Sequence, residues 1–247
     1  MASDAQIPAE PPIAVSPKSR LLAPWWHTLI LVVVLLFASL NGIQGKHPLT
    51  EVSRSKLPEY IATIVWEWIM VGFIWLGIRK RISMRELIGG RWANLEDFFL
   101  DVVYAAAFWG CALFVLGGMA KLMHLDQGDK MEAMRKSLGF LAPGSRLELA
   151  LWFGVSTTAG FCEEIIFRGY LQRQFAAIGN SMLTGVLLSA IVFGASHGYE
   201  GAARMLLIAV YGLMFGLLAW WKKSLRPGMI AHAWHDSLSG AVLRMLR

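Results

Sequence analysis

The sequence predicts an all-α protein: a bundle of about seven to eight helices that crosses a membrane several times. Of its 247 residues, 56% are hydrophobic and only 16% are charged, whereas roughly one-quarter of a soluble domain is charged. The chain also holds 11 Trp and 13 Phe, and its apolar residues gather in long runs. Runs of about 20 apolar residues are long enough to cross a bilayer as helices.

The apolar runs indicate one integral membrane domain with three parts. Residues 1–20 are polar and proline-rich, and we expect a disordered tail there. Residues 21–146 hold the first membrane helices and a polar loop, in which GDKMEAMRKSLGFL is expected to form a short amphipathic helix at the membrane surface. Residues 147–247 form a more polar helical core. The expected spans are Leu21–Leu40, Tyr60–Ile78, Phe98–Ala120, Leu147–Ile178, Ser181–Ser196, Ala202–Trp221 and Gly228–Leu246.

The net charge of +6 does not point to a nucleic-acid partner. Lys and Arg lie at the ends of apolar runs, as at 79–81 and 222–223, where they anchor helices at an anionic lipid surface. The two cysteines, Cys111 and Cys162, lie in apolar runs and have no metal-ligand spacing. We therefore expect them to be packing residues.

Several ionisable residues of the C-terminal half lie inside apolar runs. A charged side chain at a bilayer centre costs roughly 2.5–3.5 kcal/mol on insertion scales, so such residues usually face the bundle interior, pair with one another and mark function. Two acids of the N-terminal half, Glu67 and Asp101, are expected to have structural roles. The C-terminal residues are Glu163, Glu164, Arg168, His197, His232, His235 and Asp236.

Helical spacing separates the two adjacent glutamates. Glu164 and Arg168 are four residues apart, so they share a helix face and can form an ion pair. Glu163 is turned away by about 100° and has no such local partner. A carboxylate beside a histidine in a dry cavity is a candidate general base. The alternative is that all three residues form an ion-pair network that holds helices together.

His197 ends the run FGASHG, where a lone histidine is most often a cap or a packed core residue. The Gly179–Asn180 turn changes this interpretation. Glu163 lies about sixteen residues before the turn and His197 about seventeen after it, so two antiparallel helices of equal rise bring them to the same height. This placement favours a carboxylate–histidine pair.

The last apolar run contains AHAWHDSLSG. His232 and Asp236 are four residues apart on one face, Ser239 lies one turn further, and His235 is close to that face. The plainer alternative is that Asp236 only orients His232.

Three short motifs carry a family resemblance. EEIIFR fits an EExxxR pattern, FGASH fits FxxxH, and HAWHD fits HxxxN/D. In this order, on separate apolar helices, they resemble the CPBP family of CAAX proteases and bacteriocin-processing enzymes, also called the abortive-infection family. The resemblance covers roughly residues 147–247, which would be the catalytic core.

The resemblance implies a glutamate-dependent intramembrane endopeptidase that needs no metal or other cofactor and cuts a membrane-anchored peptide or protein. By this likeness Glu163, helped by His197, activates water, and His232 and Asp236 stabilise the oxyanion. Glu164 and Arg168 match positions tied to architecture. Members that process CAAX proteins typically carry Asn where this chain has Asp236. An ionised Asp has no proton to donate, so Asp236 is either protonated or orients His232.

Two other functions fit the same residues. A zinc-dependent membrane protease would use Glu and His as ligands, but no HExxH is present, and a zinc-bound Glu163 would leave another base to be found. A proton-coupled transporter or immunity-type protein would use Glu163, His197 and Asp236 as a relay, although no inverted repeat is visible. The compact chain leads us to expect a bacterial cytoplasmic membrane.

Overall fold

The structure of the protein, a computed structural model, describes residues 21–44, 55–125, 128 and 142–245. These residues form helices and turns and include no strand, which confirms the all-α prediction. The tail expected at 1–20 and most of the amphipathic helix expected in the polar loop lie outside them.

Each expected span corresponds to helical structure, with ends that differ by four residues or fewer. The spans expected at Leu147–Ile178 and Ser181–Ser196 appear as one continuous helical rod and a separate shorter helix. Two short elements, α3 and η3, were not expected. The N-terminal helices are α1 (Trp25–Gln44), α2 (Leu57–Ile78), α3 (Met84–Ile88) and α4 (Leu95–Leu122). The C-terminal elements are α6 (Arg146–Glu163), η2 (Glu164–Leu171), α7 (Gln172–Gly179), α8 (Met182–Ser196), η3 (Gly198–Glu200), α9 (Ala202–Lys222) and α10 (Arg226–Met245).

Four helices within the described residues are long and apolar enough to cross a membrane: α2, α4, the continuous rod 146–179 and α9. The apolar helices α1 and α8 are shorter, and α10 falls in neither group. Large apolar side chains such as Phe114 and Leu122 are exposed on the outside of the bundle, as a lipid-facing surface requires. The fold is that of an integral membrane protein.

Local signals fix the ends of the rod. Ser145 caps α6 through a capping box with Glu148, so two backbone N–H groups at the helix start are satisfied. Asn180 adopts the left-handed conformation with φ 50° and ends α7. Ser181 then caps α8 by accepting from the backbone of Thr184. The turn expected at Gly179–Asn180 is therefore present, and α7 and α8 form a hairpin.

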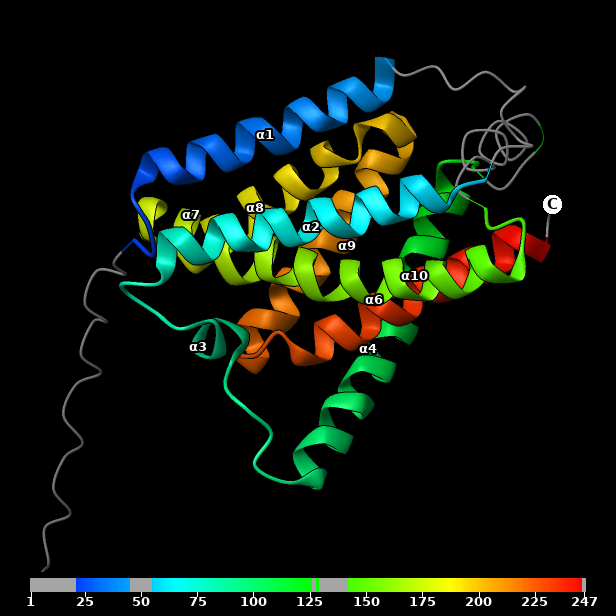
Figure 1. Ribbon diagram of the computed structural model, residues 1–247. Coiled ribbons are helices and arrows are strands. Elements are labelled where there is room, and N and C mark those ends of the chain that lie inside the picture. Colours follow the sequence, from blue (N-terminus) through cyan, green and yellow to red (C-terminus); the bar gives the residue numbers. More distant parts are fainter. Residues whose placement is uncertain (1–20, 45–54, 126–127, 129–141, 246–247) are drawn as a thin grey trace, which may run out of the picture.

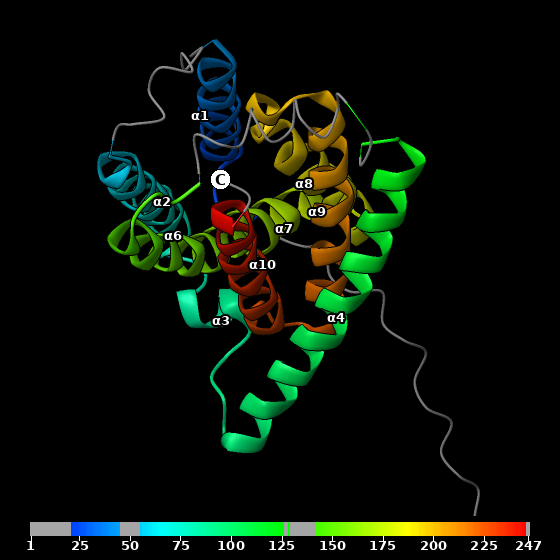
Figure 2. The same cartoon turned by 90° about the vertical axis from the view of Figure 1, so that its right-hand side faces the viewer.

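The rod α6–η2–α7 is the centre of the bundle (Figures 1 and 2). It packs against α2, α8 and α10, and α8 in turn packs against α9. Its middle section, η2, is a π-helix of eight residues, and all eight are buried. In a π-helix each N–H bonds five residues back, and such segments often occur at functional sites. This one carries Glu164 and Arg168.

Gly160 allows α10 to lie directly against α6. A Cβ atom at this position would lie 2.7 Å from the backbone nitrogen of Ala233 and 2.8 Å from the carbonyl oxygen of Met229. No side chain larger than hydrogen fits between these backbones. The close approach puts His232, which precedes Ala233, beside the two glutamates that follow Gly160 on the rod.

A buried polar network attaches α1 to the rod. The Tyr170 hydroxyl lies 2.9 Å from Nδ1 of His27 and 3.0 Å from the Thr28 hydroxyl. Gln174 donates to the same Thr28 hydroxyl at 2.7 Å. Because each polar group has a partner, the network stabilises the bundle rather than costing it free energy.

Asp101 ties α4 to the start of α10. Its Oδ2 atom accepts from the Trp92 indole at 2.8 Å and pairs with Nε of Arg226 at 2.9 Å. The side chain is buried, and both contacts are with groups near the helix ends. This environment agrees with the structural role expected for Asp101.

Candidate active site

Glu164 and Arg168 form a buried ion pair, as their spacing predicted. Nη1 of Arg168 lies 3.0 Å from Oε1 of Glu164, and both side chains are about 1% exposed. Nη2 of Arg168 donates to the Gly212 carbonyl at 3.2 Å. The guanidinium also lies over the rings of Phe193 and Phe215, at 4.3 and 4.9 Å from their centroids. Arg168 thus connects the rod to α8, α9 and the aromatic core.

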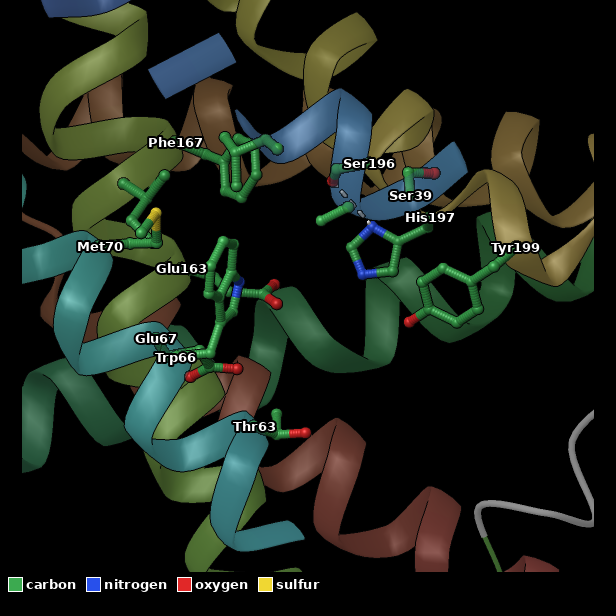
Figure 3. Close-up of a pocket in the computed structure, with 13 residues that line it drawn as sticks. Ser39, Thr63, Trp66, Glu67, Met70, Glu163, Phe167, Ser196, His197 and Tyr199 are labelled. Carbon is green, nitrogen blue, oxygen red and sulfur yellow. Dashed lines mark hydrogen bonds between the residues drawn. The ribbon is translucent and has the colours of Figure 1, made fainter. Parts of the chain in front are cut away.

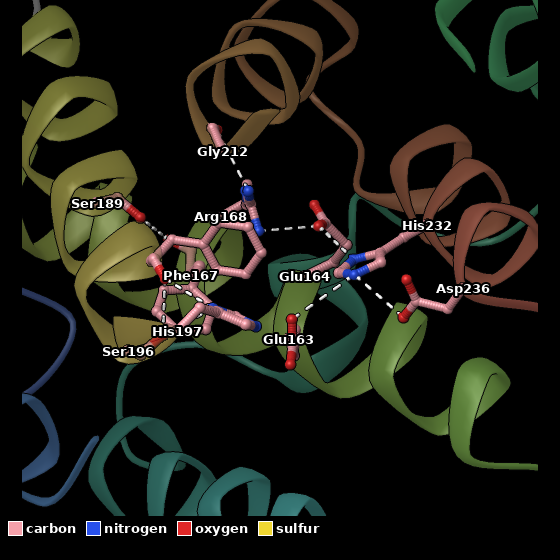
Figure 4. Close-up of polar contacts among 11 residues, drawn as sticks. Glu163, Glu164, Phe167, Arg168, Ser189, Ser196, His197, Gly212, His232 and Asp236 are labelled. Carbon is pink, nitrogen blue, oxygen red and sulfur yellow. Dashed lines mark hydrogen bonds and ion pairs between the residues drawn. The ribbon is translucent and has the colours of Figure 1, made fainter. Parts of the chain in front are cut away.

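His232 lies among three carboxyl groups (Figure 4). Its Nδ1 atom is 3.2 Å from Oε1 of Glu164. Its Nε2 atom is 3.6 Å from Oε2 of Glu163 and 3.6 Å from Oδ2 of Asp236. The first distance is a hydrogen bond and the other two are slightly longer than one. The bond to Glu164 therefore fixes the ring, and Nε2 points at the two other acids.

Glu163 and His197 line one pocket of about 210 Å³, between α1, α2, the rod and α8 (Figure 3). Much of the lining is apolar. Oε2 of Glu163 is buried and has no hydrogen-bond partner among the described residues. Figures 3 and 4 both show the Glu163 carboxyl and the His197 ring turned toward the same space. The equal heights expected from the hairpin agree with this placement. Apolar lining residues include Leu35, Met70, Ile166 and Phe167.

The hydrogen bonds of His197 determine which ring nitrogen is free. Nδ1 lies 2.9 Å from the Phe193 carbonyl oxygen and 3.3 Å from the Ser196 hydroxyl. A carbonyl oxygen only accepts, so Nδ1 carries the hydrogen. In the neutral ring, Nε2 is then an acceptor.

The structure brings the sequence-predicted site residues together in two adjoining places. Glu163 belongs to both, since it lines the pocket and also contacts His232. His232 itself does not line the pocket and lies behind Glu163. His235 is apart from the cluster and packs its ring on Tyr211 at 4.9 Å.

Two pocket residues were not assigned to the site from the sequence. Glu67 of α2 and Tyr199 of η3 both line the pocket beside Glu163 and His197. For Glu67 the signal was present, since an acid in the middle of an apolar span is unusual. Its position on the pocket favours a role other than the structural one expected. For Tyr199 there was no signal, because η3 was not anticipated.

Within the described residues, no group of three or more His, Cys, Asp and Glu side chains is arranged to hold a metal ion. In the cluster around His232, two of the three acids also have a second role. Glu164 pairs with Arg168, and Glu163 faces the pocket.

Fold and site together define a class: helical integral membrane proteins with buried glutamates and histidines beside an apolar pocket. Residues 145–238 match the model of the family described as Type II CAAX prenyl endopeptidase Rce1-like. The matched region runs from the cap of α6 into α10 and contains all three motifs. This match over part of the chain supports a protease of the CAAX type and confirms the resemblance. No curated protein and no solved structure gave a significant match.

In general terms, the match supports an endopeptidase that acts on a membrane-associated protein. The match names a type of enzyme. It does not assign a role to any residue of this chain.

Proposed function

We propose that the protein is an intramembrane endopeptidase that hydrolyses a peptide bond of a membrane-associated substrate, either prenylated or carrying a leader peptide, without metal or other cofactor. One observation carries the proposal. The Glu163 carboxyl lies between two histidines, lines a pocket with one of them, and has a buried oxygen with no hydrogen-bond partner among the described residues. That oxygen, Oε2, faces Nε2 of His232 at 3.6 Å, so Oε1 is the atom available to a water in the pocket, as a general base requires.

Glu163 and His197 supply the two acceptors that a water molecule requires. The Glu163 carboxylate accepts one hydrogen and, as the general base, removes it. Nε2 of His197 accepts the other, because Nδ1 is already committed to the Phe193 carbonyl. The water oxygen then has a lone pair aimed at the peptide carbon. The proton of the water moves to Glu163 and afterwards to the amide nitrogen of the peptide fragment that leaves.

His232 and Asp236 stabilise the negative charge that develops on the carbonyl oxygen. His232 donates from Nδ1 to Glu164, so it can donate from Nε2 only when the ring carries both hydrogens. Three surrounding carboxyl groups favour that charged ring. The Asp236 carboxyl, 3.6 Å from Nε2, fits the role of orienting the ring.

Glu164 and Arg168 position this machinery rather than take part in it. Arg168 holds Glu164, and Glu164 holds Nδ1 of His232. Both side chains are almost fully buried and neither lines the pocket.

The test is cleavage of membrane-anchored peptides by the purified protein in detergent, with the products read by mass spectrometry. The peptides include a prenylated CAAX peptide and lipid-anchored leader peptides. Glu163→Gln keeps the size of the side chain but cannot take a proton, so we expect a folded protein with activity reduced by about 10²–10⁴-fold or more. Glu59→Gln, an exposed position on α2, is the control and should remain active.

Turnover by Glu163→Gln near the wild-type rate would remove Glu163 from the mechanism. Proton-gradient-dependent uptake by liposomes without any cleavage would support the transporter instead. We also propose that the membrane is the bacterial cytoplasmic membrane, an expectation that fractionation of the expressing organism tests.

A further inference from the structure

We infer that Glu67 is a further catalytic residue: a neutral carboxyl group that donates a hydrogen bond to the carbonyl oxygen of the peptide bond being cut. This inference rests on the proposed peptidase function. It starts from a residue that the three motifs do not include and that lies outside the matched region 145–238.

The position of Glu67 is that of an active-site group. It lies near the middle of α2, is only 7% exposed, and lines the same pocket as Glu163 and His197 (Figure 3). Its Oε2 atom is buried and has no hydrogen-bond partner among the described residues. A buried carboxyl without a partner costs stability. Folding alone therefore gives no reason for an acid at this position.

The shared pocket favours the neutral form of Glu67. Two carboxylates in one apolar pocket are not both ionised at low cost, so one of them holds a proton. The charge belongs on Glu163, whose side chain is 18% exposed and lies 3.6 Å from Nε2 of His232. Glu67, the more buried acid, keeps its hydrogen and becomes a donor.

Few other donors remain in the pocket. The hydroxyl groups of Ser39, Thr63 and Ser196 already donate to backbone carbonyls, at 2.9, 2.9 and 2.8 Å. His197 and Glu163 are acceptors in the proposed mechanism. His232, the donor of the proposed mechanism, approaches from the far side of Glu163 and does not line the pocket, so Glu67 is a second donor that acts from the pocket side. A carbonyl oxygen that enters the pocket thus finds the Glu67 O–H as a donor, and the Tyr199 hydroxyl and the Trp66 indole N–H are the competing donors.

The step conserves atoms and charge. The water oxygen bonds to the carbonyl carbon as its proton passes to Glu163, and the carbonyl oxygen becomes negative. Glu67 keeps its own proton and only strengthens its hydrogen bond as that charge grows. This is the kind of interaction that accelerates a reaction, because it is stronger in the transition state than in the ground state.

Two substitutions separate a donor from a structural acid. Glu67→Leu removes the donor and also removes a buried acid without a partner, so we expect a melting temperature equal to or above the wild-type value. Its kcat should fall by about 10²–10³-fold, the usual loss for one oxyanion donor, with KM changed only a few-fold. Glu67→Gln keeps an N–H donor and should be at least about tenfold more active than Glu67→Leu.

Glu59→Gln on the exposed side of α2 is the control and should stay near wild-type kcat. Tyr199→Phe tests the competing hydroxyl, and a loss of kcat in this variant as large as that in Glu67→Leu would assign the donor role to Tyr199 instead. Infrared spectra at neutral pH give a readout that does not depend on activity. The carbonyl band of a neutral carboxyl should be present in the wild-type protein and lost in Glu67→Gln.

Several results would overturn the inference. They are normal kcat in Glu67→Leu, a loss confined to KM, a loss that follows a lowered melting temperature, or no change in the neutral-carboxyl band in Glu67→Gln. If the wild-type protein cuts peptides and Glu67→Leu does so equally well, only the role of Glu67 fails. If the wild-type protein cuts none of the peptides, the proposed function fails, and the inference fails with it.

Discussion

One oxygen of Glu164 contacts both Arg168 and His232. Oε1 lies 3.0 Å from Nη1 of Arg168 and 3.2 Å from Nδ1 of His232. The motif on the rod and the motif on α10 are therefore joined at a single atom. Because the acid is buried, its two partners balance the cost of desolvating its charge. A substitution at any of the three residues should therefore alter the contacts of the other two.

Arg168→Ala tests this dependence. The substitution leaves Glu164 buried with only His232 as partner, and breaking a buried ion pair typically costs about 3–5 kcal/mol. We expect poor expression and a clearly lower melting temperature, with activity lost as a consequence. Arg173→Ala is the control. Arg173 is partly buried and donates to the Leu87 carbonyl at 3.0 Å, so its substitution should lower the melting temperature less than Arg168→Ala does. A stable but inactive Arg168→Ala protein would mean that Arg168 acts directly in catalysis.

Gly160→Ala tests the contact between α6 and α10. The new methyl group would meet backbone atoms of Ala233 and Met229 at 2.7 and 2.8 Å, and overpacking of this kind costs about 1–3 kcal/mol. Thermal unfolding in detergent should show the loss, and cleavage should fall because His232 moves away from Glu163.

Gly154→Ala is the matched control on the same helix. The nearest atom to its Cβ would be Cδ1 of Ile64 at 4.0 Å. Alanine is the better helix former by about 1 kcal/mol, so this variant should be as stable as the wild-type protein or more stable. Equal unfolding temperatures for the two alanine variants would show that the contact at Gly160 is not tight in the membrane protein.

Much of this arrangement could be predicted from the sequence, because the signals are local. Apolar runs gave every long helix, and four-residue spacing gave the pair of Glu164 and Arg168. The Gly179–Asn180 turn gave the common height of Glu163 and His197. Each of these follows from helix geometry alone.

Contacts between helices far apart in the sequence were not predictable in the same way. The π-helix at Glu164–Leu171 has no sequence signal that we recognised. The meeting of Glu67 with Glu163 depends on how α2 lies against the rod, which periodicity does not determine. The bond between Glu164 and His232 depends on the close approach at Gly160. The sequence does not show these packing contacts. For this reason Glu67 was expected to have a structural role, although the structure places it on the pocket.

Substitutions of Asp236 distinguish two ways in which it can assist His232: through a polar group near the ring, or through its negative charge. If the residue orients the ring or completes the oxyanion site, Asp236→Asn keeps an oxygen near Nε2 and adds amide donors, so cleavage should stay within about tenfold, a change of roughly 1.4 kcal/mol in barrier. Asp236→Ala removes both and should lose about 10²-fold or more. An inactive Asp236→Asn protein of normal stability would instead show that the negative charge of Asp236 is required.

Removal of metal tests whether Glu163 acts as a free base. We expect cleavage to be unchanged after treatment with EDTA and gel filtration, because the proposed water is activated by Glu163 and His197 alone. Loss of activity that zinc then restores would favour the zinc-dependent protease. Inhibition by added zinc would not, since a histidine such as His197 binds the ion readily in its neutral form. Glu163→Gln sharpens the comparison: an inactive variant, together with a wild-type protein that EDTA leaves active, agrees only with a carboxylate that takes the proton itself.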